Sequence, residues 1–420
     1  MTQITESGND AVDSKQGLGE GFNRLFYAFI ATKLADGLIA SAGPLLAATL
    51  TRDPVVISMM GATYMLPWLL FAIPIGTLVD RLDRRKTLSV VNLIRAAMAA
   101  LLALALFFGF INITLFYVSI FVVGICDVFS DTVTQALVPT LVQHRQLEKA
   151  NSRISGADTI LVGFVGAPLG GVIFAIAAVV PWVVETLGFV AASLLIAAIP
   201  ASLIASKAAS GAERESFVAE MKSGISYLWN HKKLLRLVIT TSALGLLFNV
   251  ANSTQVLYAL DTLKIPQAFY GAVMTGGAVG ALVGAWVAPR VSKKYGRGTG
   301  LALGITTTTI FELLQGLAPN AAWYMIAMFF GGLGVAAWNI LLMSLYHTLI
   351  PNEIFGKIHG TRRTLVWGLM PVGAIIGGVI AKIDLRLPYL IAGSLAIVVA
   401  ATAFKFFREL GNSAVPPEAM

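Results

Sequence analysis

Long apolar runs separated by short polar turns make up most of the chain, beginning near Phe22 and continuing almost to the C-terminus. A helix needs about 20 mostly apolar residues to cross the hydrocarbon of a membrane, and these runs have that length. We therefore predict an all-α, polytopic membrane protein with twelve transmembrane helices. The predicted spans begin near Phe22, Pro54, Lys86, Ile113, Ser152, Pro181, Leu234, Pro266, Thr299, Ala321, Arg362 and Pro388.

A single long polar stretch, residues 207–233, interrupts this pattern and divides the predicted spans into two sets of six. We predict a disordered cytoplasmic tail over 1–20, a six-helix bundle over 21–206, a cytoplasmic linker over 207–233, a second six-helix bundle over 234–409 and a C-terminal tail over 410–420. Within the linker, Phe217, Met221, Ile225 and Leu228 recur at helical spacing. This spacing predicts an amphipathic helix lying on the inner leaflet.

The two sets of spans resemble each other at a separation of about 208 residues, a spacing that we interpret as an internal repeat. Gly76 and Gly284 end the second and eighth spans, and "LVQHRQLEKAN" from Leu141 recurs loosely as "LIPNEIFGKIH" from Leu349. Two pseudo-symmetric six-helix bundles predict a binding site between them near the membrane midplane, as in transporters. A structural duplication without a transport role is the alternative.

Composition and charge placement agree with a membrane protein. Hydrophobic residues make up 57% of the chain and charged residues only 12%, whereas soluble domains have about 45–50% and 25%. If the N-terminus is cytoplasmic, 24 of the 30 Lys and Arg fall in tails or cytoplasmic loops and four fall outside. This asymmetry is what the positive-inside rule predicts. We expect a multi-pass protein of the cell membrane with both termini cytoplasmic, and the net charge of +8 then needs no nucleic-acid partner.

The sequence contains no motif for a metal site or for a phosphate-binding loop. Cys126 is the single cysteine, the four histidines are scattered without metal-ligand spacing, and no G-x-x-x-x-G-K-S/T phosphate loop occurs. We expect no enzyme activity, no cofactor and no metal site. The expected partners are a small-molecule substrate, protons and membrane lipids, and the expected state is a monomer.

One loop is dense in charge. "GTLVDRLDRRK", between the second and third spans, fits the pattern G-x-L-x-D-R-x-x-R-R through Gly76, Leu78, Asp80, Arg81, Arg84 and Arg85. This pattern resembles the signature of the major facilitator superfamily. The resemblance implies the fold of that family and a role for the loop as a conformational latch. Asp80 is expected to cap a helix N-terminus, and the arginines are expected to pair with carboxylates and lipid phosphates. A positive-inside anchor is the alternative.

Within that superfamily, the chain resembles most the twelve-span drug:proton antiporter branch of macrolide-efflux, Tap-like and enterobactin-exporter proteins. The resemblance rests on "KLADGLIASAGPLLA", "ALVPTLVQHRQLEKANSRISG" and "MKSGISYLWNHKKLLRL". The fifth span resembles an exporter-type G-x-x-x-G-P-x-x-G-G motif, although its proline falls one place late. The matching residues are Gly163, Gly166, Pro168, Gly170 and Gly171. Glycines at this spacing also serve close helix packing alone.

Ionisable residues within spans are costly and usually functional. Lys33, Arg95, Asp127 and Asp131 fall roughly 10–16 Å from the cytoplasmic face at about 1.5 Å per residue, with Asp36 slightly deeper. For Asp36 and Asp127 we weigh proton coupling or substrate binding against structural pairing with Lys33 and Arg95. Arg95 and Asp131 are expected to be more structural.

Three further carboxylates are expected to be structural. Asp158 lies near the cytoplasmic end of the fifth span, and we expect it to pair with Arg153. Glu185 and Glu312 are expected close to the outer interface, where their side chains reach water.

Polar and aromatic residues of the second half are candidates for a substrate cavity. They are Asn249, Asn252, Gln255, Trp338, Asn339 and Trp367. Asn252 is three residues from both Asn249 and Gln255, which predicts a polar strip on one helix face. An apolar pocket with few polar groups suits amphipathic organic molecules, although aromatic residues at helical spacing also serve packing.

The leading hypothesis is a secondary active transporter that exports amphipathic, drug-like or siderophore-like molecules by proton antiport with alternating access. A facilitator or importer of a lipid-like or nutrient solute is the alternative within transport. A membrane enzyme or receptor scaffold is the alternative from another class, and it would need a catalytic constellation or an attached domain.

Overall fold

The computed structural model describes residues 18–79, 81–200 and 225–413. These residues are almost entirely helical, and no strand occurs among them. The amphipathic helix expected over 213–230 lies mainly outside the described residues, and the described part from Ile225 onward is helical up to residue 230.

Within residues 18–79 and 81–200, the first half has five uninterrupted long helices and one composite helix. The composite helix runs from Leu147 to Ile176 and contains a π-helical segment, η2. The elements are α2 (Glu20–Leu50), α3 (Pro54–Val79), α4 (Arg84–Phe107), α5 (Ile113–Leu141), the 3₁₀ turn η1 (His144–Gln146), α6 (Leu147–Asp158), η2 (Thr159–Gly166), α7 (Ala167–Ile176) and α8 (Val180–Ala197).

The second half repeats this arrangement with a break in its first span. The helix α10 ends at Asn252, and the chain resumes as helix at Gln255 after Ser253 and Thr254. The elements are α10 (Lys232–Asn252), α11 (Gln255–Leu257), the π-helical η4 (Tyr258–Thr262), α12 (Gln267–Tyr295), α13 (Arg297–Gly316), α14 (Ala321–Leu349), α15 (Asn352–Ala381) and α16 (Leu387–Ser413).

Among the described residues, eleven helices are long and apolar enough to cross a membrane, which makes the chain a multi-pass membrane protein. The span predicted from Thr299 corresponds to α13, which is helical but too polar to meet that criterion, because it contains four consecutive threonines and Glu312. It packs between α14 and α16. The prediction of an all-α polytopic protein is confirmed.

Helix α15 begins ten residues earlier than predicted. The sequence pattern placed its start at Arg362, where the apolar run begins, whereas the helix starts at Asn352. The polar residues before Arg362 extend the helix beyond the apolar segment, and hydrophobicity alone does not mark that end.

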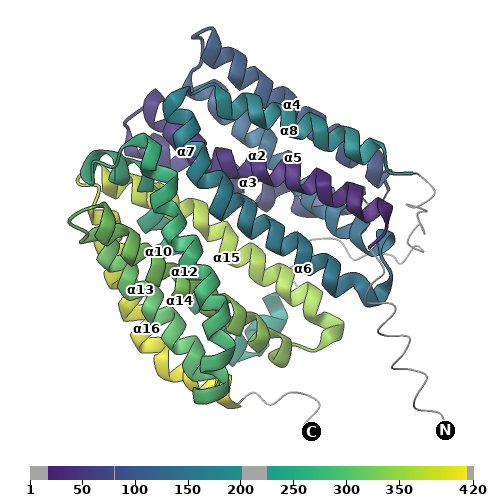
Figure 1. The fold of residues 1–420 in the computed structure, drawn as a ribbon. Coiled ribbons are helices and arrows are strands. Elements are labelled where there is room, and N and C mark those ends of the chain that lie inside the picture. The colour runs from purple at the N-terminus through teal and green to yellow at the C-terminus, as the bar shows by residue number, and fades with distance from the viewer. Residues whose placement is uncertain (1–17, 80, 201–224, 414–420) are drawn as a thin grey trace, which may run out of the picture.

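The two bundles diverge toward the end of the molecule at which α2 begins and α16 ends (Figure 1). We call this the terminal end, and the opposite end, with the loops after α2 and α15, the far end. Between the bundles, the most extensive contacts join α3 to α15 and α7 to α12.

The buried core explains this shape. One apolar cluster contains residues of both halves, such as Leu45 and Trp182 from the first and Tyr258 and Tyr324 from the second. The other two clusters each belong to one half and include the terminal ends of the helices. Apolar burial therefore joins the halves at the far end and holds each half together separately at the terminal end.

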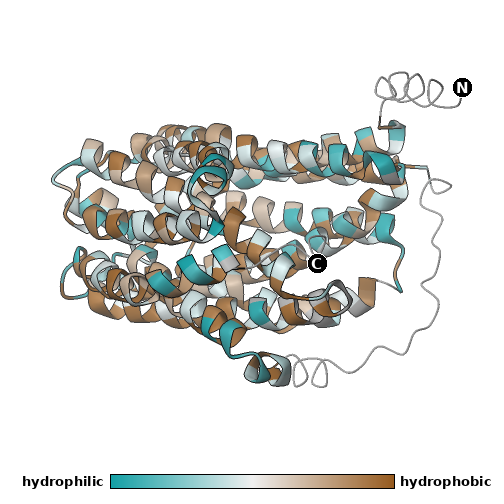
Figure 2. Cartoon of the chain, turned by 90° about the horizontal axis from the view of Figure 1, so that it is seen from below, coloured by the Kyte–Doolittle hydropathy of each residue, from teal (hydrophilic) through white to brown (hydrophobic). Residues whose placement is uncertain are grey.

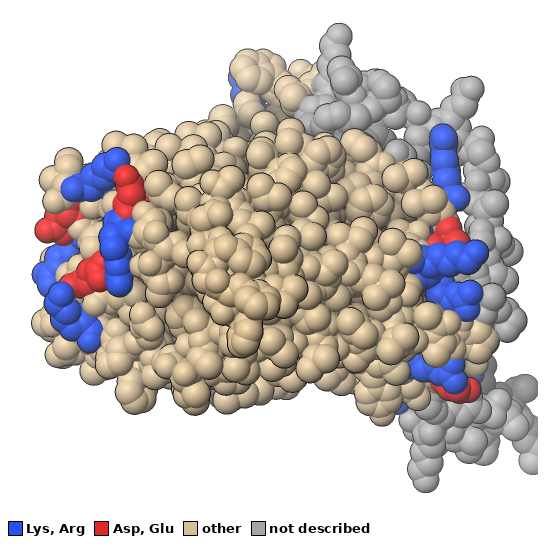
Figure 3. All heavy atoms as spheres, turned by 90° about the horizontal axis from the view of Figure 1, so that it is seen from above, with Lys and Arg blue, Asp and Glu red and all other residues tan. Residues whose placement is uncertain are grey.

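Charge and hydropathy mark a membrane-sized band. Figure 3 shows described Lys, Arg, Asp and Glu at the two ends of the molecule, with an uncharged surface between them. Hydropathy follows the same division, since the polar residues gather at the loops of both ends (Figure 2). The uncharged band exposes large apolar side chains, among them Leu187, Leu194 and Val398, which are more than half exposed. An apolar surface of this extent is stable when lipid surrounds it.

Candidate functional site

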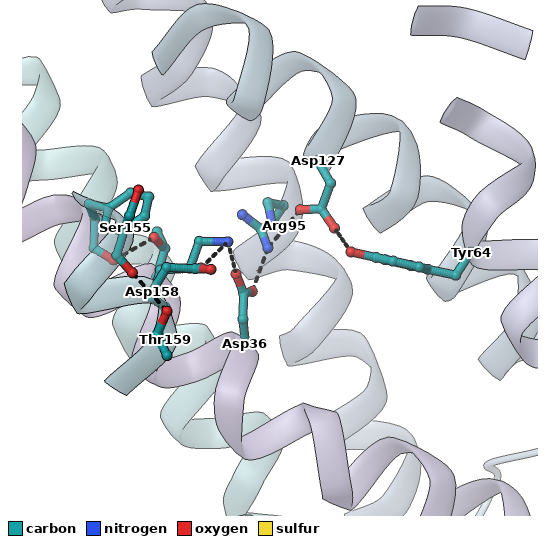
Figure 4. A network of polar contacts seen from close by, with 10 residues as sticks. Asp36, Tyr64, Arg95, Asp127, Ser155, Asp158 and Thr159 are labelled. Atoms are coloured by element: carbon teal, nitrogen blue, oxygen red, sulfur yellow. Dashed lines mark hydrogen bonds and ion pairs between the residues drawn. The ribbon is translucent and has the colours of Figure 1, made fainter. Parts of the chain in front are cut away.

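A network of charged side chains lies inside the first bundle, centred on Arg95 of α4. Arg95 is 3% exposed, and its Nη2 lies 2.6 Å from Asp36 Oδ1 of α2 and 2.8 Å from Asp127 Oδ1 of α5. Its guanidinium also lies 4.0 Å from the ring centre of Phe189 on α8. One cation thus connects two carboxylates from different helices (Figure 4).

The network continues on both sides of Arg95. Lys33 Nζ lies 3.2 Å from Asp36 Oδ2 and 3.5 Å from Asp158 Oδ1, and the hydroxyl of Tyr64 donates a hydrogen bond of 2.8 Å to Asp127 Oδ2. Each carboxylate near the centre therefore has a cation or a hydroxyl as partner. Buried charges are tolerated under that condition, because unpaired ones carry a large desolvation cost.

One expectation from the sequence, the partner of Asp158, is wrong. Asp158 pairs with Lys33 rather than with Arg153, because η2 begins directly after it and its carboxylate faces α2. Asp131 accepts a hydrogen bond of 2.7 Å from Gln135 one turn later on α5. Asp131 lines the two cavities described below.

The charged network borders a cavity of about 420 Å³ within the first bundle. Lys33, Tyr64, Arg95, Asp127 and Asp131 all line it. The carboxylate of Asp127 is therefore reachable from the cavity, whereas Asp36 is not among its lining residues and Arg95 is almost fully buried.

A second cavity of about 660 Å³ lies between the two halves. Asp131 and Gln135 of α5 form its wall on the first half, and helices α10, α13, α14, α15 and α16 form the rest. Three of the six cavity candidates, Trp338, Asn339 and Trp367, line it.

The other three cavity candidates lie elsewhere. The amide nitrogen of Asn249 donates to the carbonyl of Gly245 in its own helix, and that of Asn252 donates to the carboxylate of Glu312. Gln255 donates to the hydroxyl of Tyr324 at 2.9 Å. The predicted polar strip does not extend to Gln255, because the helix is broken between Asn252 and Gln255.

We expected Glu185 and Glu312 close to the outer interface with their side chains in water, but both are buried. Glu185 is 5% exposed and Glu312 is 3% exposed. Glu312 lines the cavity between the halves, and Glu185 lies in α8 within the first bundle. Sequence position along the helix gave the depth of these residues but not the side of the helix that they occupy.

The glycines of the fifth span meet two different helices. A methyl group on Gly166 would lie 2.5 Å from the Cα of Gly37 on α2, and one on Gly170 would overlap the carbonyl oxygen of Leu38. On the other side, a methyl group on Gly163 would lie 3.1 Å from Ala278 and one on Gly171 would lie 3.1 Å from the backbone of Gly271, both on α12 of the second half. The motif therefore packs against a neighbour in its own bundle and against the opposite bundle.

The shifted proline of this motif follows the π-helical segment. Pro168 is at the start of α7, directly after η2. Proline removes one backbone donor and clashes with the preceding turn of a regular helix, and a π-helical turn is wider.

The charged loop after α3 stays within the first half. Asp80 lies outside the described residues, and Asp83 caps α4 by accepting from the backbone N–H of Lys86 at 3.1 Å. Arg84 donates to the carbonyl of Ala136, and Arg85 donates to the carbonyl of Ile199 at 2.9 Å. These arginines bond to backbone carbonyls of neighbouring helices instead of the carboxylates that the sequence suggested. Arg81 is exposed, and Gly76 has open space around its Cα.

Ion pairs between the halves close the far end. Arg52 Nη1 lies 2.9 Å from Asp261 Oδ1, and Lys382 Nζ lies 3.2 Å from Asp53 Oδ2. The pKa of the Asp53 carboxyl lies below its usual value, because the backbone N–H of Val55 donates to it and Lys382 stabilises its charge. Sequence reasoning placed Arg52 and Lys382 outside the membrane but gave no reason to pair them.

Aromatic residues also connect the halves nearer the middle. Trp68 of α3 and Trp367 of α15 meet edge to face with ring centres 6.0 Å apart. Neither Trp68 nor Tyr64 could be singled out from the sequence, because both lie in an apolar span that contains no charge. Among the described residues, no group of three His, Cys, Asp or Glu could hold a metal ion.

Two helical bundles that enclose a cavity, open toward one end and closed at the other, define a membrane transporter. The sequence model of the Major Facilitator Superfamily matches residues 25–370 and 237–419. The chain belongs to this superfamily, and it is a transporter of small molecules and not an enzyme.

Curated relatives and solved structures agree with this assignment. Macrolide efflux protein A of Streptococcus pyogenes is 23% identical over 355 residues, which cover 83% of this chain and 87% of that protein. Macrolide efflux protein A of Enterococcus faecalis is 22% identical over 312 residues, covering 73% and 95%. The structure of a bacterial homologue of the iron transporter ferroportin, in an inward-facing state, has a TM-score of 0.73 at 16% identity and covers 93% of this chain and all of that one. The nucleoside transporter NupG has a TM-score of 0.71 at 14% identity, covering 93% and 99%.

Proposed function

We propose that the protein exports amphipathic small molecules in exchange for protons, by alternating access. The curated relatives are named for macrolide efflux, and the cavity between the halves combines apolar walls with a small number of polar groups. Such a lining suits molecules that carry a large apolar surface and few polar groups.

The terminal end, in this proposal, faces the cytoplasm. Of the 30 Lys and Arg, 24 lie in segments assigned to that side, which is the distribution of the positive-inside rule. The conformation is then open to the cytoplasm and closed by the far-end ion pairs, ready to receive a molecule from inside the cell. The working unit is a monomer in the cell membrane, since one chain contains both halves and the cavity between them.

The main support for proton coupling is the position of Arg95 between Asp36 and Asp127. Asp127 lines the first-bundle cavity, so a proton can reach it from water. Protonation of Asp127 removes its charge and leaves Arg95 with Asp36, which weakens the connection between α4 and α5. A change in helix packing that depends on proton binding is what an antiporter needs.

Transport in everted membrane vesicles tests this proposal. With an imposed pH gradient, vesicles containing the wild-type protein should accumulate a macrolide, and collapse of the gradient should abolish accumulation. Asp127→Asn and Asp36→Asn should each abolish gradient-driven accumulation while the protein remains folded in the membrane. Asp158→Asn serves as control, because Asp158 contacts only the outer cation of the network.

Three outcomes would contradict the proposal. Normal gradient-driven transport by both variants excludes these carboxylates as the coupling site. Equilibration of the solute without a proton requirement identifies a facilitator, and movement in the opposite direction identifies an importer.

The loop from Gly76 to Arg85 completes the proposal as a latch for the opposite conformation. In the described conformation Arg84 and Arg85 bond only within the first half, on the side where the halves are apart. Closure of the terminal end would bring this loop toward the second half, with Asp80 and Arg81 available for new pairs. A positive-inside anchor would tolerate Asp80→Asn, whereas a latch would lose turnover.

A further inference from the structure

Glu312 is a buried carboxylate that has no cation as partner among the residues that the structure describes. It lies in the last turn of α13, is 3% exposed and lines the cavity between the halves. Its Oε1 accepts a hydrogen bond of 3.2 Å from the Nδ2 of Asn252 on α10. Within residues 18–79, 81–200 and 225–413, no Lys, Arg or His nitrogen forms an ion pair with it.

The carboxylates of the first-half network differ from Glu312 in this respect. Asp36 and Asp127 both contact Arg95, and Asp36 also contacts Lys33. A positively charged ligand in the first-bundle cavity would have to displace a protein cation from these groups. At Glu312 it would displace none.

The remaining charged groups of the cavity lie far from Glu312. Asp131 stands on the opposite wall, in α5, and bonds to Gln135. Arg362 of α15 stacks over the ring of Tyr346 at 4.6 Å. At about 1.5 Å per residue, Glu312 lies about 6 Å from the far end of its helix and Arg362 about 28 Å from the far end of its own. The charged groups of α10, α12 and α16, from Lys232 to Arg236, Arg290 to Lys294 and Lys405 to Glu409, are also at the terminal end.

The surroundings of Glu312 select the rest of the ligand. The cavity wall is largely apolar and aromatic, formed by residues such as Phe248, Ile305, Trp338 and Met370. A carboxylate in such surroundings is costly when ionised and alone, and it is stabilised when a positive group replaces the missing water. A volume of about 660 Å³ accommodates a drug-sized molecule.

We infer that Glu312 binds the positively charged group of a lipophilic organic cation, such as a protonated amine, in the cavity between the halves. The inference rests on the proposed function, since it names the class of molecule exported. It assigns substrate charge recognition to the second half and leaves the first-half network for the proton.

A matched pair of fluorescent probes tests this assignment. Dansylcadaverine carries one ammonium group at neutral pH, and its N-acetyl derivative has the same fluorophore and chain without the charge. Binding of each probe to the purified full-length protein is measured by fluorescence titration without any ion gradient. The wild type should bind the charged probe at least tenfold more tightly than the neutral one.

Three variants locate the source of that preference. Glu312→Gln keeps the shape and the hydrogen bond to Asn252 but cannot ionise, so it should bind both probes with equal affinity. Glu312→Asp keeps the charge and should retain part of the preference. Glu185→Gln removes an equally buried carboxylate that lines neither cavity, and it should leave the preference unchanged.

The inference is overturned if the wild type shows no preference for the charged probe, or if Glu312→Gln keeps the preference of the wild type. Because the titration needs no gradient, its outcome is independent of proton antiport. A protein that passes this test and fails the vesicle assay recognises organic cations without exchanging them for protons. A protein that fails this titration and passes the vesicle assay is a proton antiporter in which Glu312 does not recognise the charge of the substrate.

Discussion

Arg95 acts on two helices through a single guanidinium. It bonds to Asp36 of α2 and Asp127 of α5, and Phe189 of α8 covers its plane. Arginine suits this position better than lysine, because its planar group presents several donors in fixed directions and remains charged. The residue therefore sets the packing of four helices in the first bundle.

Removal of Arg95 is predicted to destabilise the first bundle strongly. In Arg95→Ala, Asp36 keeps Lys33 as partner, whereas Asp127 keeps only the hydroxyl of Tyr64. Breaking a buried ion pair from one side costs about 3–5 kcal/mol. We expect a loss of that size in the free energy of unfolding, measured by chemical denaturation of the purified protein in detergent.

A double variant separates the effect of charge from the effect of packing at Arg95, and a variant at a second arginine is the control. Arg95→Ala combined with Asp127→Asn should recover part of the lost stability, because no unpaired carboxylate remains at Asp127. Arg236→Ala, which removes an exposed arginine stacked on Phe406, should change stability by less than about 0.5 kcal/mol. Equal losses in the single and double variants would show that Arg95 contributes only through packing.

The site was partly predictable at this scale. Charges within apolar spans are rare enough to identify Lys33, Asp36, Arg95, Asp127 and Asp131 from the sequence, and the structure brings the first four into one network. Tyr64 could not be identified, because an aromatic residue in an apolar span has the same pattern whether it packs or donates a hydrogen bond. Its role depends on the distance between α3 and α5, which no local pattern contains.

At the scale of single elements, α12 and the composite fifth span form one of the two most extensive contacts between the halves. The backbone of Gly271 lies directly against Ala167 and Pro168, so no side chain fits between them. Close contact of this kind depends on glycine, because any Cβ would separate the backbones.

Gly271→Ala is predicted to shift the protein toward a conformation that is open at the far end. The added methyl group would overlap the carbonyl oxygen of Ala167 across the boundary between the halves. Spin labels at Thr51→Cys and Ile383→Cys, in a Cys126→Ala background, report the separation of the halves there by pulsed electron paramagnetic resonance. The distance between the labels should increase in Gly271→Ala.

Gly61→Ala is the matched control for this measurement. Gly61 lies on α3, which also contacts the other half, but a methyl group there meets no atom within 4 Å. The label distance should stay at the wild-type value. An unchanged distance in Gly271→Ala would show that the contact yields by local adjustment instead of controlling separation.

Helix positions were largely readable from the sequence, and their ends were less so. Apolar length gave starts within three residues for most spans, such as Pro54 and Ala321, which are the first residues of α3 and α14. The start of α15 and the break after Asn252 were missed. Both depend on polar segments whose conformation is decided by tertiary packing and not by hydrophobicity.

At the scale of the whole molecule, two ion pairs hold the far end closed across the boundary between the halves. Arg52 pairs with Asp261, and Lys382 pairs with Asp53. All four side chains are partly exposed, so salt screens each pair and each contributes modestly. Their combined effect is to bias a balance between two conformations rather than to determine the fold.

The pH dependence of this closure follows from Asp53. Since the pKa of its carboxyl is lowered in the closed conformation, the stabilisation is fully present above the usual aspartate value, about 3.9. It is lost as the pH falls through the lowered pKa. The label distance between Thr51→Cys and Ile383→Cys should therefore stay constant from neutral pH down to about 5 and increase only below about 4.

Asp53→Asn is the control for this titration. It should give a longer mean distance at neutral pH, because Lys382 loses its partner, and it should make the change in distance at low pH smaller, since only the Arg52–Asp261 pair then remains. A change centred near pH 6 in the wild type would contradict the assignment to Asp53, since no shift of that carboxyl in the observed direction produces it.

The polarity of α13 has a consequence for the assembly of the protein during synthesis. This helix lacks the hydrophobicity to partition into the bilayer alone, and eleven of its residues are buried against other helices, chiefly α14 and α16. Its integration therefore depends on helices that the ribosome completes later. A nascent chain that ends after Gly316 should therefore leave α13 outside the lipid. The second bundle is complete in the membrane only after α14 and α16 have been synthesised.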